Sequence, residues 1–126
     1  MNSRLTNKDR GLIKGALRRV FARSDLHKEA VAATRIEYSD PARPRVKKWS
    51  MCPICLKPTP TYLVQIDHII PVIAVTSSLA EMTWDELVDR MWCSADNLQG
   101  ICLQCHKIKC KVEAEARKTH KKESKK

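Results

Sequence analysis

The 126-residue sequence lacks long apolar runs and lacks the pattern of a secretory leader. No apolar stretch approaches the roughly 18 residues that a membrane span needs, so we expect no membrane partner. Residues 1–20 carry six Lys or Arg side chains and no continuous apolar segment, unlike a signal peptide. We therefore expect a soluble, cytoplasmic chain of one domain with extensions, whose thiols stay reduced.

The six cysteines include two C-x-x-C pairs, Cys52/Cys55 and Cys102/Cys105, and the sequence has no other internal repeat. A secreted disulfide scaffold is the rival interpretation, but it needs an oxidising compartment. Zn²⁺ prefers four tetrahedral ligands, and each C-x-x-C turn offers two thiolates on one side of a bend. Because 46 residues separate the pairs, the predicted four-cysteine zinc site joins the base of a long excursion. Such a link suits a centre too small to be stable through its apolar core alone.

The net charge of +10 is unevenly distributed along the chain. Residues 1–50 contain 13 basic and 5 acidic side chains, and residues 107–126 contain 9 and 3. Residues 51–106 contain only 2 basic and 6 acidic side chains, so an acidic centre lies between two basic flanks. Basic flanks neutralise phosphates and acidic centres attract metal cations, so this pattern favours a nucleic-acid partner over a merely solubilising charge.

We predict an α+β chain with a basic helical extension, a basic linker, a folded domain and a disordered Lys-rich tail, at residues 1–36, 37–50, 51–118 and 119–126. Thr6 with Asp9 is an expected cap for a first helix, and Ser24 for a second that ends near Arg35. Prolines break helical structure in the linker, and Trp49 is expected to anchor it.

For the folded domain we predict, in chain order, a hairpin, a short helix, a loop and a longer helix, at residues 51–75, 83–92, 93–101 and 103–118. Inside the hairpin we expect a loop over residues 57–61 and a strand from Tyr62 to Ile66. Thr83 with Glu86 matches a capping box. Apolar residues at helical spacing are expected to pack on the core: Leu12, Ile13, Ala16, Leu17, Val20 and Phe21, and Trp84, Leu87, Val88, Met91 and Trp92.

A second group of polar residues lies around the predicted zinc site. Asp67 and His68 follow the predicted strand, and His106 comes directly after the last cysteine of the second pair. If zinc joins the two segments, the two histidines lie near each other. Phosphodiester hydrolysis needs a base for water and a cation for the phosphate charge. Asp67 and His106 can hold the cation and His68 can be the base, the alternative being purely structural roles.

The strings I-D-H-I-I-P and D-N-L-Q-G-I-C-L-Q-C-H-K-I-K resemble the HNH endonuclease family, in its zinc-knuckle form with two C-x-x-C pairs. The His, Asn and final His of that family are matched by His68, Asn97 and His106. The resemblance covers residues 50–112, roughly half of the chain. It implies the ββα-metal (His-Me finger) fold, in which a hairpin and a helix hold one divalent ion, and it favours a phage or bacterial source.

By this resemblance, the chain is expected to hydrolyse DNA, with double-stranded DNA as partner, leaving 5′-phosphate and 3′-hydroxyl ends. His68 would deprotonate water, and Asp67 and His106 would bind the catalytic cation, commonly Mg²⁺, with Mn²⁺ as an alternative. Asn97 would hold the loop that orients the base. A phage-encoded chain would act in the cytoplasm of a bacterial host.

Several assignments keep an alternative. His106 could replace Cys105 as the fourth zinc ligand. Cys110 could join the catalytic ion, although we expect a packed free thiol there, and we expect Cys93 to be buried apolar filler. Residues 76–92 insert a loop and a helix between the hairpin strands, and they either shape substrate access or only pack.

Candidate phosphate contacts are the basic side chains near the site, namely Arg45, Lys47, Lys48, Lys107, Lys109 and Lys111. A zinc-linked nucleic-acid-binding module without hydrolysis would need the same flanks and the same zinc. A phage packaging accessory protein, working through protein contacts in an undetermined oligomeric state, is a third possibility. The group of Asp67, His68 and His106 favours the enzyme, because binding alone needs no base beside a metal site.

Overall fold

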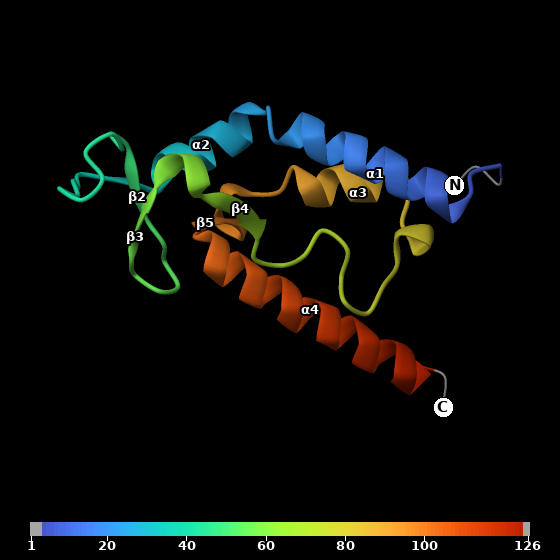
Figure 1. Ribbon diagram of the computed structural model, residues 1–126. Coiled ribbons are helices and arrows are strands. Elements are labelled where there is room, and N and C mark those ends of the chain that lie inside the picture. The colour runs from blue at the N-terminus through green and yellow to red at the C-terminus, as the bar shows by residue number, and fades with distance from the viewer. Residues whose placement is uncertain (1–3, 125–126) are drawn as a thin grey trace.

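The computed structural model describes residues 4–124, which form a small α+β chain (Figure 1). Its four α-helices are α1 (Asn7–Phe21), α2 (Asp25–Ala33), α3 (Trp84–Met91) and α4 (Leu103–Ser124). Its five strands are β1 (Arg35–Ile36), β2 (Trp49–Met51), β3 (Pro58–Pro60), β4 (Gln65–His68) and β5 (Leu98–Ile101). Within this described part, no helix combines the length and the apolar character that crossing a membrane requires.

The two N-terminal helices begin at the predicted caps. Thr6 and Asp9 form a reciprocal capping box, with hydrogen bonds of 3.0 and 3.1 Å between each side chain and the other residue's backbone N–H. Ser24 caps α2 through its side-chain oxygen. α2 ends at Ala33, close to the predicted end near Arg35, and the chain then pairs as β1 with β2.

A three-stranded antiparallel sheet, in the order β1-β2-β3, carries the first C-x-x-C turn. Met51 of β2 lies opposite Pro58 of β3, so residues 52–57 form the turn between them. The loop predicted over residues 57–61 therefore contains a strand. Thr61–Leu63 form a 3-10 turn, so the strand predicted from Tyr62 begins only at Gln65.

The second sheet pairs β4 antiparallel with β5, from Gln65 opposite Ile101 to His68 opposite Leu98. β5 lies in the segment predicted as a loop, residues 93–101. That prediction failed because the strand is defined by its pairing with a distant segment, which local sequence does not show. α4 begins directly after β5, so the two strands lead into the long helix.

α4 continues to Ser124, so the predicted disordered tail is wrong for residues 119–124. Residues 125–126 of that tail lie outside the described part. The helix persists because the segment from Leu103 onward contains neither Gly nor Pro and is rich in the helix formers Ala, Glu, Lys and Arg. The basic charge that suggested disorder is therefore carried on an ordered helix.

The main core lies where α1 and α3 meet the loop that follows β4; its buried side chains are Phe21, Val72, Ile73, Met82, Leu87 and Met91. The predicted apolar face of α3 is confirmed at Leu87 and Met91, whereas Val88 is exposed. The predicted stripe of α1 is only partly buried, since Leu12 and Val20 are exposed. α1 therefore contacts the core along one narrow edge.

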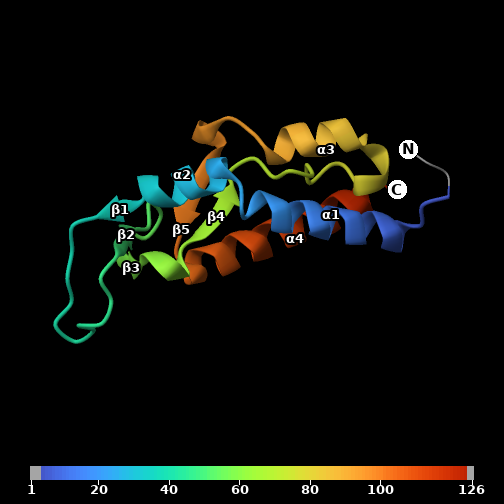
Figure 2. The ribbon, with the colours of Figure 1, turned by 90° about the horizontal axis from the view of Figure 1, so that it is seen from above.

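α1 and α4 lie on opposite sides of the loop that joins β4 to α3 (Figure 1). α1 and α3 lie on one side of the loop that joins β4 to α3, and α4 lies on the other side (Figure 1). Viewed from above, α1 passes over α4 (Figure 2). In both views the β1–β2 loop projects from the end of the molecule opposite to the one where α1 begins and α4 ends.

Gly100 in β5 marks a close approach between α2 and the β4–β5 sheet. A Cβ atom there would lie 2.4 Å from Thr34 Cγ2 and 2.9 Å from Val64 Cγ1. We expect Gly100→Ala to lower the free energy of unfolding by about 1–3 kcal/mol through overpacking, as measured by urea denaturation. Gly11→Ala is the control, because a Cβ on that helical glycine meets nothing within 4 Å. Equal stability of the Gly100 variant and the wild type would contradict this close packing.

Candidate functional site

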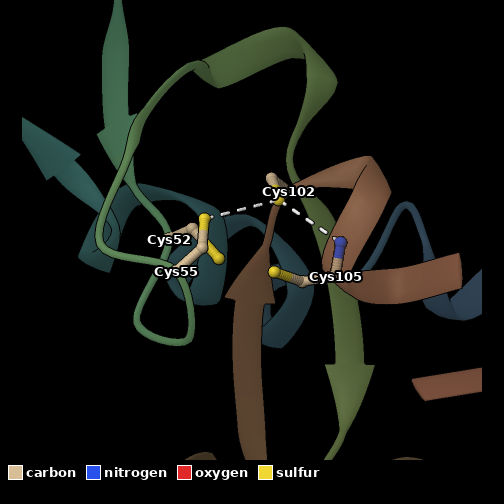
Figure 3. A group of neighbouring side chains, drawn as sticks. All are labelled: Cys52, Cys55, Cys102 and Cys105. Atoms are coloured by element: carbon tan, nitrogen blue, oxygen red, sulfur yellow. Dashed lines mark hydrogen bonds between the residues drawn. The ribbon is translucent and has the colours of Figure 1, made fainter. Parts of the chain in front are cut away.

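The four cysteines of the two C-x-x-C pairs come together, as predicted (Figure 3). Cys52 and Cys55 lie on the turn after β2, Cys102 follows β5, and Cys105 lies in the first turn of α4. Their sulfur atoms all lie within 4.8 Å of one another, and the Sγ atoms of Cys55 and Cys102 are 3.8 Å apart. Thiolates about 2.3 Å from a tetrahedral ion would themselves be about 3.8 Å apart. The cluster could therefore hold a metal ion such as zinc.

The thiols differ in the hydrogen bonds that they make. Burial raises the pKa of Cys52, but backbone N–H groups of Cys55, Cys102 and Ile54 donate to its sulfur and bring that pKa down to about 6. The hydrogen bond with the Cys102 thiol, together with burial, raises the pKa of Cys105 to about 12. Thiolates are the metal-binding form, so an ion that enters would release the proton held by Cys105.

All six cysteines are free, which removes the disulfide alternative. The alternative in which His106 replaces Cys105 as a ligand gains no support, because Cys105 belongs to the cluster and His106 does not. Cys93, expected to be buried, is only half-buried. Cys110 is exposed, so the prediction of a packed thiol is wrong. Its Sγ atom lies 3.6 Å from Nε2 of His106, one helical turn earlier.

His68 ends β4 and is buried, with 8% of its surface exposed. Its Nε2 atom lies 2.7 Å from the backbone carbonyl oxygen of Met91, at the end of α3. Because a carbonyl only accepts hydrogen bonds, Nε2 carries the proton and Nδ1 keeps a free lone pair in the neutral ring. The ring of Phe21 packs on the imidazole, with 5.2 Å between centroids. Segments outside the sheet thus fix the orientation of His68.

Asp67, beside His68, is bound to a lysine on α4. Lys109 Nζ lies 3.1 Å from Asp67 Oδ2, donates to the His68 carbonyl oxygen at 3.1 Å, and also pairs with Glu113. Burial lowers the pKa of Lys109, but hydrogen bonds and charges from Glu113 and Asp67 outweigh burial, so the net pKa is raised. Gln99 donates to the same Asp67 oxygen at 3.0 Å. Lys109, a candidate phosphate contact, is therefore directed into the protein.

Asn97 links the segment after β4 to the segment before β5. Its Oδ1 atom accepts from Ile70 N at 2.8 Å, and its Nδ2 atom donates to Ile70 O at 3.2 Å. Its own carbonyl oxygen accepts from Ile69 N at 2.8 Å. These three bonds hold the two residues that follow His68, so Asn97 fixes the backbone beside the histidine.

Asp67, His68 and His106 line one cleft, which lies between α1 and α4 and has a volume of about 560 Å³. The loop after β4 also contributes to the walls. Outside the four cysteines, no three His, Cys, Asp or Glu side chains of residues 4–124 form a comparable ligand group. Asp67, His68 and His106 therefore share the walls of the cleft without forming a ligand group of three among the described residues.

The cleft also contains basic side chains whose place the sequence did not reveal, namely Lys14, Arg18, Arg117, Lys118 and Lys121. For the residues on α4, helical spacing in the sequence indicates which side chains share a face with His106. Counting from His106, residues 110, 113, 117 and 120 fall on one helical face, and all of them line the cleft. The helix predicted over residues 103–118 already contains residues 110, 113 and 117, so this shared face could have been recognised from the sequence.

The remaining candidate phosphate contacts lie elsewhere. Lys107 and Lys111 are exposed on α4 but do not line the cleft. Arg45, Lys47 and Lys48 are exposed and do not line the cleft. They belong to the β1–β2 loop, which projects from one end of the molecule (Figures 1 and 2). Trp49 at the end of this loop is buried, and its indole Nε1 donates to the Val46 carbonyl oxygen at 3.3 Å. This anchors the loop as predicted.

We expect the purified protein to contain one equivalent of a metal ion such as zinc, because four clustered thiols match its tetrahedral preference. Cys52→Ser should lose this ion and lower the melting temperature, since structural zinc contributes roughly 10–16 kcal/mol of apparent binding energy in peptides. Cys93→Ser, outside the cluster, should keep both the ion and the stability. Elemental analysis and thermal melting test this expectation. A metal-free protein that melts like a metal-loaded one would contradict it.

The structure thus contains a four-cysteine cluster and, next to it, a cleft with Asp67, His68 and His106. The function must be inferred from the chemistry of these two sites. No family model and no curated protein matches the sequence, and no solved structure matches the fold.

Proposed function

We propose that this chain is a metal-dependent endonuclease of the HNH type, which hydrolyses phosphodiester bonds in double-stranded DNA. The observation that carries the proposal is the buried His68, whose Nε2–H is bound by the Met91 carbonyl and which lines the cleft together with Asp67 and His106. A neutral imidazole held in this way has one nitrogen ready to accept a proton, as a general base requires.

The order of elements around the cleft supports the same proposal. β4 and β5 form an antiparallel pair, and α4 follows β5 directly. His68 ends β4, Asn97 precedes β5, and His106 lies in the first turns of α4. This is the order that the resemblance to the ββα-metal fold implies. The ion of the four-cysteine cluster is, in this proposal, a structural Zn²⁺ that joins the β2–β3 turn to the start of α4.

The chemistry assigned to His68 is a single proton transfer. Nδ1 takes a proton from water as the water oxygen forms a bond to phosphorus. The bond from phosphorus to the 3′-oxygen breaks, and the leaving oxygen takes a proton from solvent. The products are a 5′-phosphate and a 3′-hydroxyl. Asn97 keeps the imidazole in place by holding residues 69 and 70.

The donor set of the cleft fits a hard divalent cation such as Mg²⁺ or Mn²⁺. Asp67 offers a carboxylate, a hard oxygen donor, on the wall of the cleft. His106 adds a ring nitrogen on the same cleft. Two protein ligands suit Mg²⁺, which keeps several waters and takes phosphate oxygens. A cation bound by Asp67 and His106 would stabilise charge on the phosphate and on the leaving oxygen.

One observation favours a second candidate, a zinc-linked nucleic-acid-binding or phage packaging accessory protein without intrinsic cleavage. Lys109 occupies both carboxylates of the cleft, Asp67 and Glu113. If its ammonium permanently takes the place of the cation, Asp67 has no role in catalysis. The enzyme is preferred because an ammonium in place of the metal cation does not explain why His68 is buried and held in one orientation.

The proposal is tested by incubating supercoiled plasmid with Mg²⁺ or Mn²⁺. The wild type is expected to produce nicked or linear DNA. His68→Gln should slow cleavage by about 10²–10⁴-fold, the usual contribution of a general base. Asp89→Asn, exposed on α3 outside the cleft, should cleave like the wild type. If the wild type binds but does not cut DNA, the accessory protein replaces the enzyme as the preferred function.

The role of Lys109 has its own test. Lys109→Met removes the ammonium that Asp67 and Glu113 share, so we expect Mn²⁺ to bind about fivefold more tightly, the size of one partly exposed ion pair. Calorimetric titration of Mn²⁺ into the zinc-loaded protein measures this affinity. Lys107→Met is the control, because Lys107 pairs with neither carboxylate. Unchanged or weaker Mn²⁺ binding by Lys109→Met would show that the lysine does not compete for the ion.

A further inference from the structure

The charges that line the cleft fall into two groups. The acidic side chains, Asp67 and Glu113, both pair with Lys109. A separate basic group comes from two helices that are far apart in sequence: Lys14 and Arg18 from α1, and Arg117 from α4. In the described residues 4–124, none of these three forms an ion pair with a carboxylate.

The pKa of Lys14 shows that positive charges repel one another in this basic group. It is half-buried, and burial followed by the positive charges of Arg18 and Arg117 lowers its pKa. Of the three positive side chains that line this part of the cleft, Lys14 and Arg117 are half-buried and Arg18 is exposed. Charges of one sign at short range raise the free energy of the folded state unless an anion joins them.

Arg117 is held in a fixed position without being neutralised. Its Nη1 atom donates to the Ala74 carbonyl oxygen at 3.2 Å, and its Nη2 atom donates to the Ile73 carbonyl oxygen at 2.5 Å. Carbonyl groups orient the guanidinium, but they leave its full charge facing the cleft. The loop after β4 thus preorganises one side of the basic group.

We propose that Lys14, Arg18 and Arg117 form a binding site for a backbone phosphate of DNA that flanks the scissile phosphate. The proposal rests on the proposed nuclease function, since it takes DNA as the occupant of the same cleft. Arg117 lies 11 residues after His106 on α4, which is about 16 Å along the helix axis. At about 3.4 Å of rise per base pair, the bound phosphate lies several nucleotides from the one that is cut.

The side chains of this group are of the kind that binds phosphate. A guanidinium binds two phosphate oxygens at once, and an ammonium adds a point charge. Two helices supply the contacts, so the strand would run between α1 and α4, where Figure 2 shows the two helices crossing. The N-terminal extension would then contribute directly to substrate binding.

The test measures DNA affinity with no divalent cation added, so that cleavage does not enter the result. Fluorescence anisotropy of a labelled 30-base-pair duplex is recorded over a series of salt concentrations. Lys14→Gln and Arg18→Gln are each expected to weaken binding about tenfold at low salt, the size of one charged hydrogen bond. Each should also reduce the slope of log affinity against log salt by about 0.9.

Arg19→Gln is the matched control, because it removes the same charge from the same helix but lies outside the cleft. It should change affinity less than twofold, on the order of a surface substitution. Lys14→Arg, which keeps the charge, should bind nearly as well as the wild type. Unchanged affinity in Lys14→Gln and Arg18→Gln would overturn the site, and so would an equal loss in Arg19→Gln.

The outcomes also separate this site from the nuclease proposal. A protein that fails to cut plasmid, yet loses DNA affinity specifically in Lys14→Gln and Arg18→Gln, would support the phosphate site and reject the enzyme. A protein that cuts plasmid, yet binds DNA equally well in all these variants, would support the enzyme and reject the site.

Discussion

The four-cysteine cluster is the constraint on which the rest of the site depends. It brings the β2–β3 turn to the junction of β5 and α4, although 46 residues separate the two C-x-x-C pairs. Cys105 and His106 are neighbours on a helix, so their side chains differ in direction by about 100°. When Cys105 faces the cluster, His106 is turned away from it and lines the cleft. An ion held by the cysteines would therefore also set the position of the whole cleft-lining face of α4.

His68 depends on a different set of contacts, supplied by the inserted segment before β5 and by the N-terminal extension. The inserted residues 76–92 provide the Met91 carbonyl that fixes the tautomer, and α1 provides Phe21, which packs on the ring. The insertion and the N-terminal extension share one apolar core, because Phe21, Leu87 and Met91 are all buried in it. The orientation of the imidazole therefore depends on the packing of that core. The insertion therefore does more than fill space.

Local features were predictable from the sequence, and features created by distant pairing were not. The capping boxes Thr6–Asp9 and Thr83–Glu86 depend on residues three apart, and both form as predicted. The cysteine cluster was predictable because its spacing has few other uses. β1, β3 and β5 have only two to four residues each, and their partners rather than their composition define them. The direction of Lys109 also escaped prediction, because it depends on the meeting of β4 and α4.

The separation of charge along the sequence becomes a separation of charge across the cleft. The acidic centre supplies Asp67, while the basic flanks supply Lys14 and Arg18 on one wall and Arg117 on the other. An anion that approaches Asp67 and Glu113 is repelled unless a cation lies between them. Lys109 provides such a cation within the protein, because it pairs with both carboxylates. A bound phosphate and a bound metal ion would each lower the cost of binding the other, because opposite charges in one partly desolvated cleft attract. In the proposed function, the basic walls and the acidic floor would thus act as one electrostatic unit that favours simultaneous binding of phosphate and cation.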